Sequence, residues 1–300
     1  MWSGAVGWGE FAPFADYADA VAVPWLHAAV EAADVGWPEQ VRDSVPVNCT
    51  VPAVDPDRAR ELVLAGHGCR TAKVKVAEPG QSLDDDIARV EAVRNAIAPD
   101  GRVRIDANGA WGVEQATHAV RLLDRAAGGL EYVEQPCATV KELAELRRRI
   151  DVPVAADESI RRATDPYRVR DLEAADIAVL KVAPLGGVRA CMEIAERIGL
   201  PVVVSSALET SVGLAAGVAL AAALPELPYA CGLGTATLLA QDLTDEPMHP
   251  VDGSLPVRAV APSPAELDAA RANAETERRW EQRLAAVRAL AERTRQDRST

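Results

Sequence analysis

Short runs of apolar, β-branched residues recur along the chain, and each run is followed by a segment with helical periodicity. The runs begin at eight positions: Val45, Thr71, Arg102, Leu130, Val152, Asp176, Pro201 and Tyr229. Their starts lie 22 to 31 residues apart, which is about the length that one strand, one helix and their turns require. Nearly continuous apolar runs are typical of parallel strands buried on both faces.

The segments between the runs carry helix signals. In residues 82–97 the apolar side chains fall on one helical face, and Ser82 with Asp85 has the pattern of a capping box. A second helix is predicted over 187–198, with Gly199 placed to end it. The longest apolar stretch, 212–224, is rich in Ala and Gly and too short to span a membrane, so it predicts a buried helix.

Eight strands alternating with seven helices predict an α/β fold. The pattern favours a closed modified TIM barrel, (β/α)7β, over the alternative of an open sheet of eight parallel strands. The barrel is expected over 45–235. Residues 1–44 and 236–300 lie outside it, and the last segment is charged, Ala-rich and helical from Pro264 onward.

Composition narrows the function classes. The chain has 300 residues, of which 49% are apolar, so it is expected to fold around a core. Its 32 basic and 45 acidic residues give a net charge of −13, which argues against a nucleic-acid partner. No apolar run is long enough for a membrane span, no basic leader opens the sequence, and five scattered cysteines suit a reducing compartment. We expect a cytoplasmic protein with no membrane partner.

Charged residues end five consecutive predicted strands, where a barrel carries its chemistry. They are, in strand order, Lys73 with Lys75, then Asp106, Glu134, Asp157 and Lys181. A buried charge without a partner costs several kcal/mol. Recurrence at equivalent positions therefore favours a site over chance packing.

The order of these strands predicts their geometry. Lys73 and Lys75 share a strand face, and Lys181 lies four strands away, on the opposite side of an eight-strand ring. The three carboxylates lie between them. An all-oxygen set selects a hard cation, so we expect Mg²⁺, with Mn²⁺ as the alternative.

Such a site suits removal of a proton next to a carboxylate. A metal-bound substrate carboxylate stabilises the enediolate that forms when the α-proton leaves. Lys73 beside Lys75 is expected to lower the pKa of the lysine amine by like-charge repulsion and partial burial, which favours the neutral base. We therefore expect a small anionic carboxylate as substrate.

Several motifs together resemble a known family. They are GWGEFAPF, VPVNCTVPAV, TAKVKV, RIDANGAW, YVEQP, AADES, VLKVAPLGG, SSALETSVGLAAG and LPYACGL. The set resembles the enolase superfamily, in the subgroup typified by muconate lactonizing enzymes, and is most similar to the actinobacterial o-succinylbenzoate synthase family. The resemblance covers the chain to about residue 258.

The resemblance implies roles for the strand-end residues. Lys75 is the acid/base lysine, Lys181 the opposing cation, and Asp106, Glu134 and Asp157 the Mg²⁺ ligands. It implies syn-dehydration of 2-succinyl-6-hydroxy-2,4-cyclohexadiene-1-carboxylate to 2-succinylbenzoate, a step of menaquinone biosynthesis.

Other residues have supporting roles by the same resemblance. Substrate contacts map onto four positions: Lys73, Ser205, Ser206 and Gly232. Asn108 and Glu158 follow the ligands closely and are expected to support them from behind. The family also builds an α+β capping domain from its terminal segments. This sequence begins only a few residues before GWGEF, so we expect 1–44 to be a truncated part of that cap, completed by 236–300.

Alternatives remain open at this stage. An N-succinylamino acid racemase or related epimerase would use the same lysine pair, and a barrel without its lid could be an inactive binding protein. Mandelate-racemase-like members use a histidine on the seventh strand, where this chain has Val204, Ser205 and Ser206. The sequence does not predict the oligomeric state.

Overall fold

The chain is described by a computed structural model, which covers residues 1–163 and 165–299 and the side chains of all of these but 294–299. Thr300, the last residue of the predicted segment 236–300, lies outside the described residues. One curled sheet of seven parallel strands, in the order β10-β9-β8-β7-β6-β5-β4, forms the centre of the fold. The strands are β4 (Cys49–Val51), β5 (Thr71–Lys75), β6 (Arg102–Asp106), β7 (Leu130–Glu134), β8 (Val154–Ala156), β9 (Ile177–Leu180) and β10 (Val202–Val204).

Residues near the predicted eighth strand close this sheet. Gly232 forms a parallel bridge with Ser205, just beyond β10, and Cys231 forms one with Val47, just before β4. The main chain bonds to both edges, with Gly232 N donating to Val204 O at 2.8 Å and Cys231 N donating to Pro46 O at 2.7 Å. The predicted modified TIM barrel is thereby confirmed, and the open-sheet alternative is wrong.

Two of the predicted strands differ from those in the structure. The run 45–51 divides: β3 (Ser44–Pro46) pairs antiparallel with β11 (Ser254–Pro256), and only β4 joins the barrel. The run that begins at Tyr229 contributes bridges instead of a regular strand. Cys231 bonds to the chain where β3 ends and β4 begins: its amide donates to Pro46 O at 2.7 Å, and its carbonyl oxygen accepts from Asn48 N at 2.9 Å.

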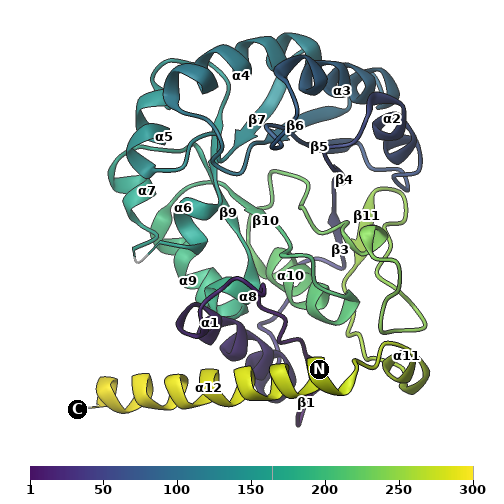
Figure 1. The fold of residues 1–300 in the computed structure, drawn as a ribbon, viewed down its shortest axis with the longest axis vertical. Helices are drawn as coiled ribbons and strands as arrows, with labels where there is room; N and C mark the ends of the chain where they lie inside the picture. Colours follow the sequence, from purple (N-terminus) through teal and green to yellow (C-terminus); the bar gives the residue numbers. More distant parts are fainter. Residues whose placement is uncertain (164, 300) are drawn as a thin grey trace.

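Helices surround the sheet on its outer side (Figure 1). They are α2 (Pro56–Leu64), α3 (Leu83–Ala96), α4 (Val113–Ala127), α5 (Val140–Arg147), α6 (Glu158–Arg161), α7 (Arg168–Asp171), α8 (Val182–Leu185), α9 (Val188–Ile198) and α10 (Ser211–Ala223). The capping box of α3 is confirmed, because Ser82 Oγ accepts from Asp85 N while Asp85 Oδ2 accepts from Ser82 N. Gly199 ends α9 in the left-handed region, as predicted.

The apolar stretch 212–224 forms α10, and twelve of its thirteen residues are buried. The prediction of a buried helix is confirmed. No helix among the described residues is long and apolar enough to cross a membrane.

The terminal segments pack together beneath the barrel (Figure 1). The N-terminal segment forms β1 (Trp2–Ser3), β2 (Trp8–Gly9), α1 (Asp19–Val30) and a π-helical turn, η1 (Glu31–Val35). The C-terminal segment forms a 3-10 turn, η2 (Ala236–Leu238), then β11, α11 (Pro264–Ala269) and α12 (Ala274–Ser299). Helix α12 lies against α1, where Leu26, Val287 and Ala291 share a small apolar core.

Glu31 joins this cap to the barrel. Its carboxylate accepts hydrogen bonds from the Val188 and Arg189 amides at the start of α9. A side chain at Gly187 would place its Cβ 2.2 Å from Glu31 Oε2, so the glycine is required by a close approach. The Gly186-Gly187 turn therefore holds a carboxylate at a helix N-terminus, and that carboxylate belongs to the chain itself.

Candidate active site

Three candidate site residues stand in one row across three neighbouring strands. Lys75 pairs with Asp106 between β5 and β6, and Asp106 pairs with Glu134 between β6 and β7. Asp157 follows β8 and Lys181 follows β9, at the same ends of their strands. The barrel thus brings together all five residues that end consecutive strands, because parallel strands place their carboxyl ends at one rim.

Lys75 and Lys73 differ in depth although they are two residues apart. The side chain of Lys75 is 32% exposed, and its Nζ donates to Asp106 Oδ2 at 2.6 Å and to Asn108 Oδ1 at 2.7 Å. The side chain of Lys73 is only 7% exposed, and its Nζ lies 3.1 Å from Asp106 Oδ2 and 2.8 Å from Glu134 Oε1. Lys75 therefore lies at the mouth of the barrel, while Lys73 is a counter-ion beneath it.

These contacts determine the charge states on the Lys75 side of the site. Burial lowers the pKa of Lys73, but the charges of Glu134 and Asp106 outweigh it and raise that pKa well above its usual range. Burial raises the pKa of Asp106, but Lys73 and Lys75 outweigh it and hold the pKa well below normal. Both shifts favour the charged forms at neutral pH, a protonated Lys73 and an ionised Asp106.

Glu134 has the opposite shift. Burial, followed by the Asp106 carboxylate, raises the pKa of Glu134 to about 7. Its Oε1 accepts from Lys73, whereas its buried Oε2 has no hydrogen-bond partner among the described residues. A buried carboxylate oxygen without a donor is costly, and Glu134 Oε2 has no donor among the described residues.

Lys181 and Asp157 form the other side of the site. Lys181 Nζ donates to Asp157 Oδ2 at 2.7 Å, and both side chains are largely buried. Burial lowers the pKa of Lys181, but Asp157 outweighs it and raises that pKa. Burial raises the pKa of Asp157, but Lys181 and Arg161 outweigh it and lower that pKa.

Sequence reasoning missed Arg161. It lies on α6, four residues after Asp157, and its Nε donates to Asp157 Oδ1 at 2.8 Å. Its Nη2 donates to Glu158 Oε1 at 2.6 Å. The signal that could have found it is the spacing of four residues between Asp157, which precedes α6, and Arg161, the last residue of that helix.

Local turns orient the carboxylates. Asp106 Oδ1 accepts from the amide of Asn108, which has a φ of 45°, a conformation that asparagine tolerates. Gln135, also missed, accepts from the amides of Asp157 and Ser159 at 3.0 and 3.1 Å and donates to Ser159 Oγ at 2.8 Å. Gln135 therefore fixes the main chain that carries Asp157.

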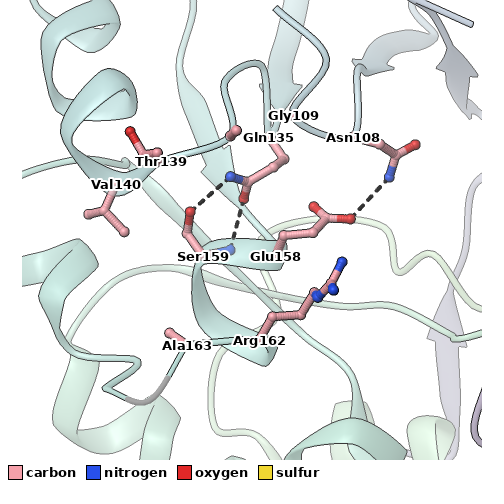
Figure 2. Close-up of a pocket in the computed structure, with 10 residues that line it drawn as sticks. Asn108, Gly109, Gln135, Thr139, Val140, Glu158, Ser159, Arg162 and Ala163 are labelled. Atoms are coloured by element: carbon pink, nitrogen blue, oxygen red, sulfur yellow. Dashed lines mark hydrogen bonds between the residues drawn. The ribbon is translucent and has the colours of Figure 1, made fainter. Parts of the chain in front are cut away.

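A cavity of about 380 Å³ opens beside these turns and is lined by Asn108, Gln135, Thr139, Glu158, Ser159 and Arg162, among others. Figure 2 shows the Asn108 amide and the Glu158 carboxylate bonded across it. Because Lys75 also bonds to Asn108, both residues contact groups of the site. The supporting role of Asn108 and Glu158 stays a prediction. Their contacts with groups of the site favour it.

The predicted substrate contacts on the far side also come together. Ser205 Oγ lies 3.4 Å from the carbonyl oxygen of Gly232, and Ser206 Oγ lies 2.7 Å from Thr235 Oγ1. Both serines are buried. These hydroxyls join the closing residues of the barrel to β10, and their contact with a substrate stays a prediction, as does that of Lys73.

Family models match most of the chain. A model described as enolase C-terminal domain-like matches residues 56–262, and one described as enolase N-terminal domain-like matches residues 1–33. The chain therefore belongs to the enolase superfamily.

Particular relatives are similar over most of this length. The chain is 64% identical to the o-succinylbenzoate synthase of Thermobifida fusca over 289 residues, which is 96% of this chain and 89% of that protein. It is 56% identical to the o-succinylbenzoate synthase of Mycobacterium tuberculosis over 287 residues, covering 96% and 86%. The predicted resemblance is confirmed.

Among solved structures, the muconate lactonizing enzyme of Pseudomonas fluorescens, complexed with muconolactone, superposes with a TM-score of 0.69 at 28% identity. The match covers 78% of this chain and 65% of that one. The chain thus spans about two thirds of the length of this structural relative.

Membership of this superfamily implies a divalent metal. Among the described side chains, those of residues 1–163 and 165–293, no group of three histidine, cysteine or acidic residues is arranged to hold a metal ion. Lysine or arginine nitrogens contact most of the carboxylate oxygens of the site. The donor chemistry nevertheless fits a hard cation. Asp106, Glu134 and Asp157 are all-oxygen donors, and Glu134 Oε2 is buried without a partner.

Proposed function

We infer that this chain catalyses the o-succinylbenzoate synthase reaction, the dehydration of 2-succinyl-6-hydroxy-2,4-cyclohexadiene-1-carboxylate to 2-succinylbenzoate. The observation that carries this conclusion is the 64% identity to the Thermobifida fusca enzyme over 289 residues. The reaction breaks a carbon–oxygen bond and releases water, so the chain is a lyase. The family resemblance places the reaction in menaquinone biosynthesis.

Lys75 exchanges the proton. Of the two lysines on β5 it is the more exposed, and it is the last residue of that strand. In its neutral form Lys75 takes the proton from the carbon next to the substrate carboxylate. The resulting ammonium returns that proton to the departing hydroxyl, so hydrogen and hydroxyl leave from one face as water. The electron pair of the broken C–H bond becomes the new ring double bond.

Lys181 supplies fixed positive charge on the opposite side. Its ammonium is held by Asp157, and its pKa is raised by that partner. A cation that keeps its proton stabilises the negative charge that develops on the substrate carboxylate. Lys75 and Lys181 thus divide the work between proton transfer and charge stabilisation.

We propose Mg²⁺ as the cofactor, with Mn²⁺ as the alternative. Asp106, Glu134 and Asp157 would hold it. When bound, such a cation stabilises negative charge on the substrate carboxylate as the α-proton leaves. The chain prepares the ligands: Asp106 and Asp157 have pKa values below their usual range, so both are ionised at neutral pH.

The electrostatics of the site suit an anionic substrate in an acidic protein. The net charge of the chain is −13, which repels an anion at long range. At the barrel mouth Lys75, Lys181 and the cation reverse the local field. We also propose a cytoplasmic location, which the five free cysteines support.

A direct assay tests the function. Purified protein with Mg²⁺ and the cyclohexadiene substrate should form 2-succinylbenzoate, detected by its mass and its aromatic absorbance, and a chelator should abolish the signal. The same protein is offered an N-succinylamino acid, and optical rotation is followed. Racemisation without dehydration would overturn the assignment in favour of the racemase alternative, which the relatives do not favour.

The binding-only alternative needs a separate measurement. In heavy water an enzyme with this site exchanges the substrate α-proton even when turnover is slow. If the metal-bound protein shows no exchange of the α-proton and no dehydration, the result supports the binding-only barrel.

A further inference from the structure

The segment Phe11–Tyr17 lies between the cap and the strand ends of the barrel. Its aromatic rings pack against Ala183, two residues after Lys181, and against Ala207, which follows β10. Phe14 and Tyr17 also stack edge-to-face on the buried Trp25, with ring centroids 5.7 and 6.5 Å away. The N-terminal segment Phe11–Tyr17 therefore borders the barrel rim that carries the site.

The C-terminal helix α12 makes its hydrogen bonds to this segment through Arg283. The Arg283 guanidinium donates to three main-chain carbonyl oxygens: Pro13 O at 3.3 Å, Phe14 O at 2.9 Å and Tyr17 O at 2.6 Å. Its side chain is 12% exposed and also lies over the ring of Trp280, which packs against Phe11. Hydrogen bonds from a buried charged group are among the stronger ones in proteins.

Tyr17 continues this connection into the site. Its hydroxyl oxygen accepts a hydrogen bond from Arg161 Nη1, and its ring lies under Arg162 at 5.3 Å. Arg161 in turn donates through Nε to Asp157 and through Nη2 to Glu158. Each nitrogen of this guanidinium thus has one partner, and Tyr17 is the partner that comes from the cap.

We propose that Arg283 and Tyr17 are positioning residues: Arg283 fixes the segment Phe11–Tyr17 on the barrel rim, and Tyr17 then holds Arg161 so that Asp157 keeps its place. On this proposal the position of the Arg161 side chain depends on α12, because Arg283 holds the segment that carries Tyr17. Neither Arg283 nor Tyr17 contacts the reacting atoms. The part that concerns Asp157 as a metal ligand rests on the proposed function, whereas the placement of the segment does not.

Hydrogen exchange of the full-length protein tests the first part. The Tyr17 amide donates to Phe14 O, an acceptor that Arg283 shares. Arg283→Met should therefore speed exchange in peptides covering residues 12–18 by about 10-fold or more, the effect of losing about 1.4 kcal/mol of local stability. Arg279→Met removes the same charge from an exposed position of α12 and should leave exchange unchanged. Equal exchange rates in both variants would overturn the proposal that Arg283 fixes the segment Phe11–Tyr17.

Calorimetry tests the second part. Tyr17→Phe keeps the ring packing and removes only the oxygen that accepts from Arg161. It should weaken Mg²⁺ binding about 10-fold, the low end of the cost of losing a partner behind a metal ligand. Tyr167→Phe makes the same change just before α7, where the ring packs against Arg197, and should bind Mg²⁺ like the parent protein. Unchanged Mg²⁺ affinity in Tyr17→Phe would overturn the role of Tyr17.

The two readouts separate this inference from the proposed function. Neither requires the cyclohexadiene substrate. A protein that shows the exchange and calorimetric contrasts but no dehydration would retain both positioning residues and lose the assigned reaction. A protein that dehydrates its substrate without either contrast would retain the reaction and lose the positioning residues.

Discussion

Asp106 Oδ2 accepts hydrogen bonds from both lysines of β5, at 2.6 Å from Lys75 Nζ and 3.1 Å from Lys73 Nζ. One carboxylate oxygen therefore links the partly exposed Nζ of Lys75 to the buried Nζ of Lys73. The two lysines share a strand face but have different partners beyond Asp106, since Lys73 reaches Glu134 and Lys75 reaches Asn108. Because their partners differ, we expect substitution of Lys75 to affect turnover and substitution of Lys73 to affect stability.

Lys75→Ala should lower the turnover rate by at least about 100-fold and leave the fold intact. Loss of a general base costs about 10²- to 10⁴-fold in rate, and the partly exposed side chain contributes little to the core. Turnover of the cyclohexadiene substrate and the thermal unfolding midpoint are measured together. Lys141→Ala, at an exposed position of α5, serves as the control and should keep full activity. An active Lys75→Ala enzyme would refute its role as the base.

Lys73→Met should instead reduce stability. It leaves the Glu134 carboxylate buried without its cation, and breaking a buried ion pair from one side costs about 3–5 kcal/mol. Urea unfolding of the metal-free protein measures this loss, with Lys141→Met as the surface control. Saturating Mg²⁺ should narrow the deficit, because the cation replaces the lost positive charge. A variant as stable as the parent without metal would contradict the ion-pair network.

Asp157→Asn should weaken Mg²⁺ binding. The amide lacks the charge of the carboxylate, and a ligand is expected to contribute at least the roughly 10-fold that partners behind ligands contribute. Isothermal calorimetry gives the Mg²⁺ affinity directly. Asp151→Asn, at an exposed position before β8, is the matched control. Parent-like affinity in Asp157→Asn would remove that residue from the ligand set.

Glu209→Gln should change how stability depends on pH. Burial, followed by the Glu10 carboxylate, raises the pKa of Glu209 to about 7. The group faces Glu10, Lys181 and the Ala207 amide, which donates to it at 2.7 Å. The folded chain therefore holds this proton more tightly than the unfolded chain does. The stabilisation is fully present below the usual pKa of about 4.3 and is lost as pH rises through about 7.

Glutamine mimics the protonated acid and does not ionise. Glu209→Gln should thus be more stable than the parent at pH 8, by on the order of 1–3 kcal/mol, and the difference should shrink towards pH 5. Denaturant unfolding of the metal-free proteins at both pH values measures the effect. Glu226→Gln, at an exposed position after α10, should show no such trend. A pH-independent difference for Glu209→Gln would contradict the raised pKa.

The barrel and the central residues of the site were predictable from sequence for one physical reason. Charged residues such as Asp106 end runs that are otherwise apolar, and a parallel sheet brings the ends of neighbouring strands to one rim. Local periodicity and burial therefore specify both the strand and the place of its final charge. Arg161 was also within reach of such reasoning, since it follows Asp157 by one helical turn.

The parts that escaped prediction depend on long-range contacts. Tyr17 meets Arg161 across 144 residues of chain, and Glu31 meets Val188 across 157. Neither contact has a periodic signal, because it depends on how the cap is seated and not on the local pattern. The division of 45–51 into β3 and β4 escaped for the same reason, since β3 pairs with β11 near the opposite end of the chain.

The position of Arg283 in the chain has a consequence for biosynthesis. The carbonyl oxygens that it binds belong to residues made 266 to 270 positions earlier. Ribosomes add about 5–20 residues per second. The segment that contains Phe11, Phe14 and Tyr17 is therefore without its hydrogen bonds to Arg283 during most of translation. If Arg283 fixes this segment as proposed, the segment is fixed on the rim only after α12 has left the exit tunnel. A chain that ends before α12 would lack Arg283 and with it the three hydrogen bonds to the carbonyl oxygens of Pro13, Phe14 and Tyr17.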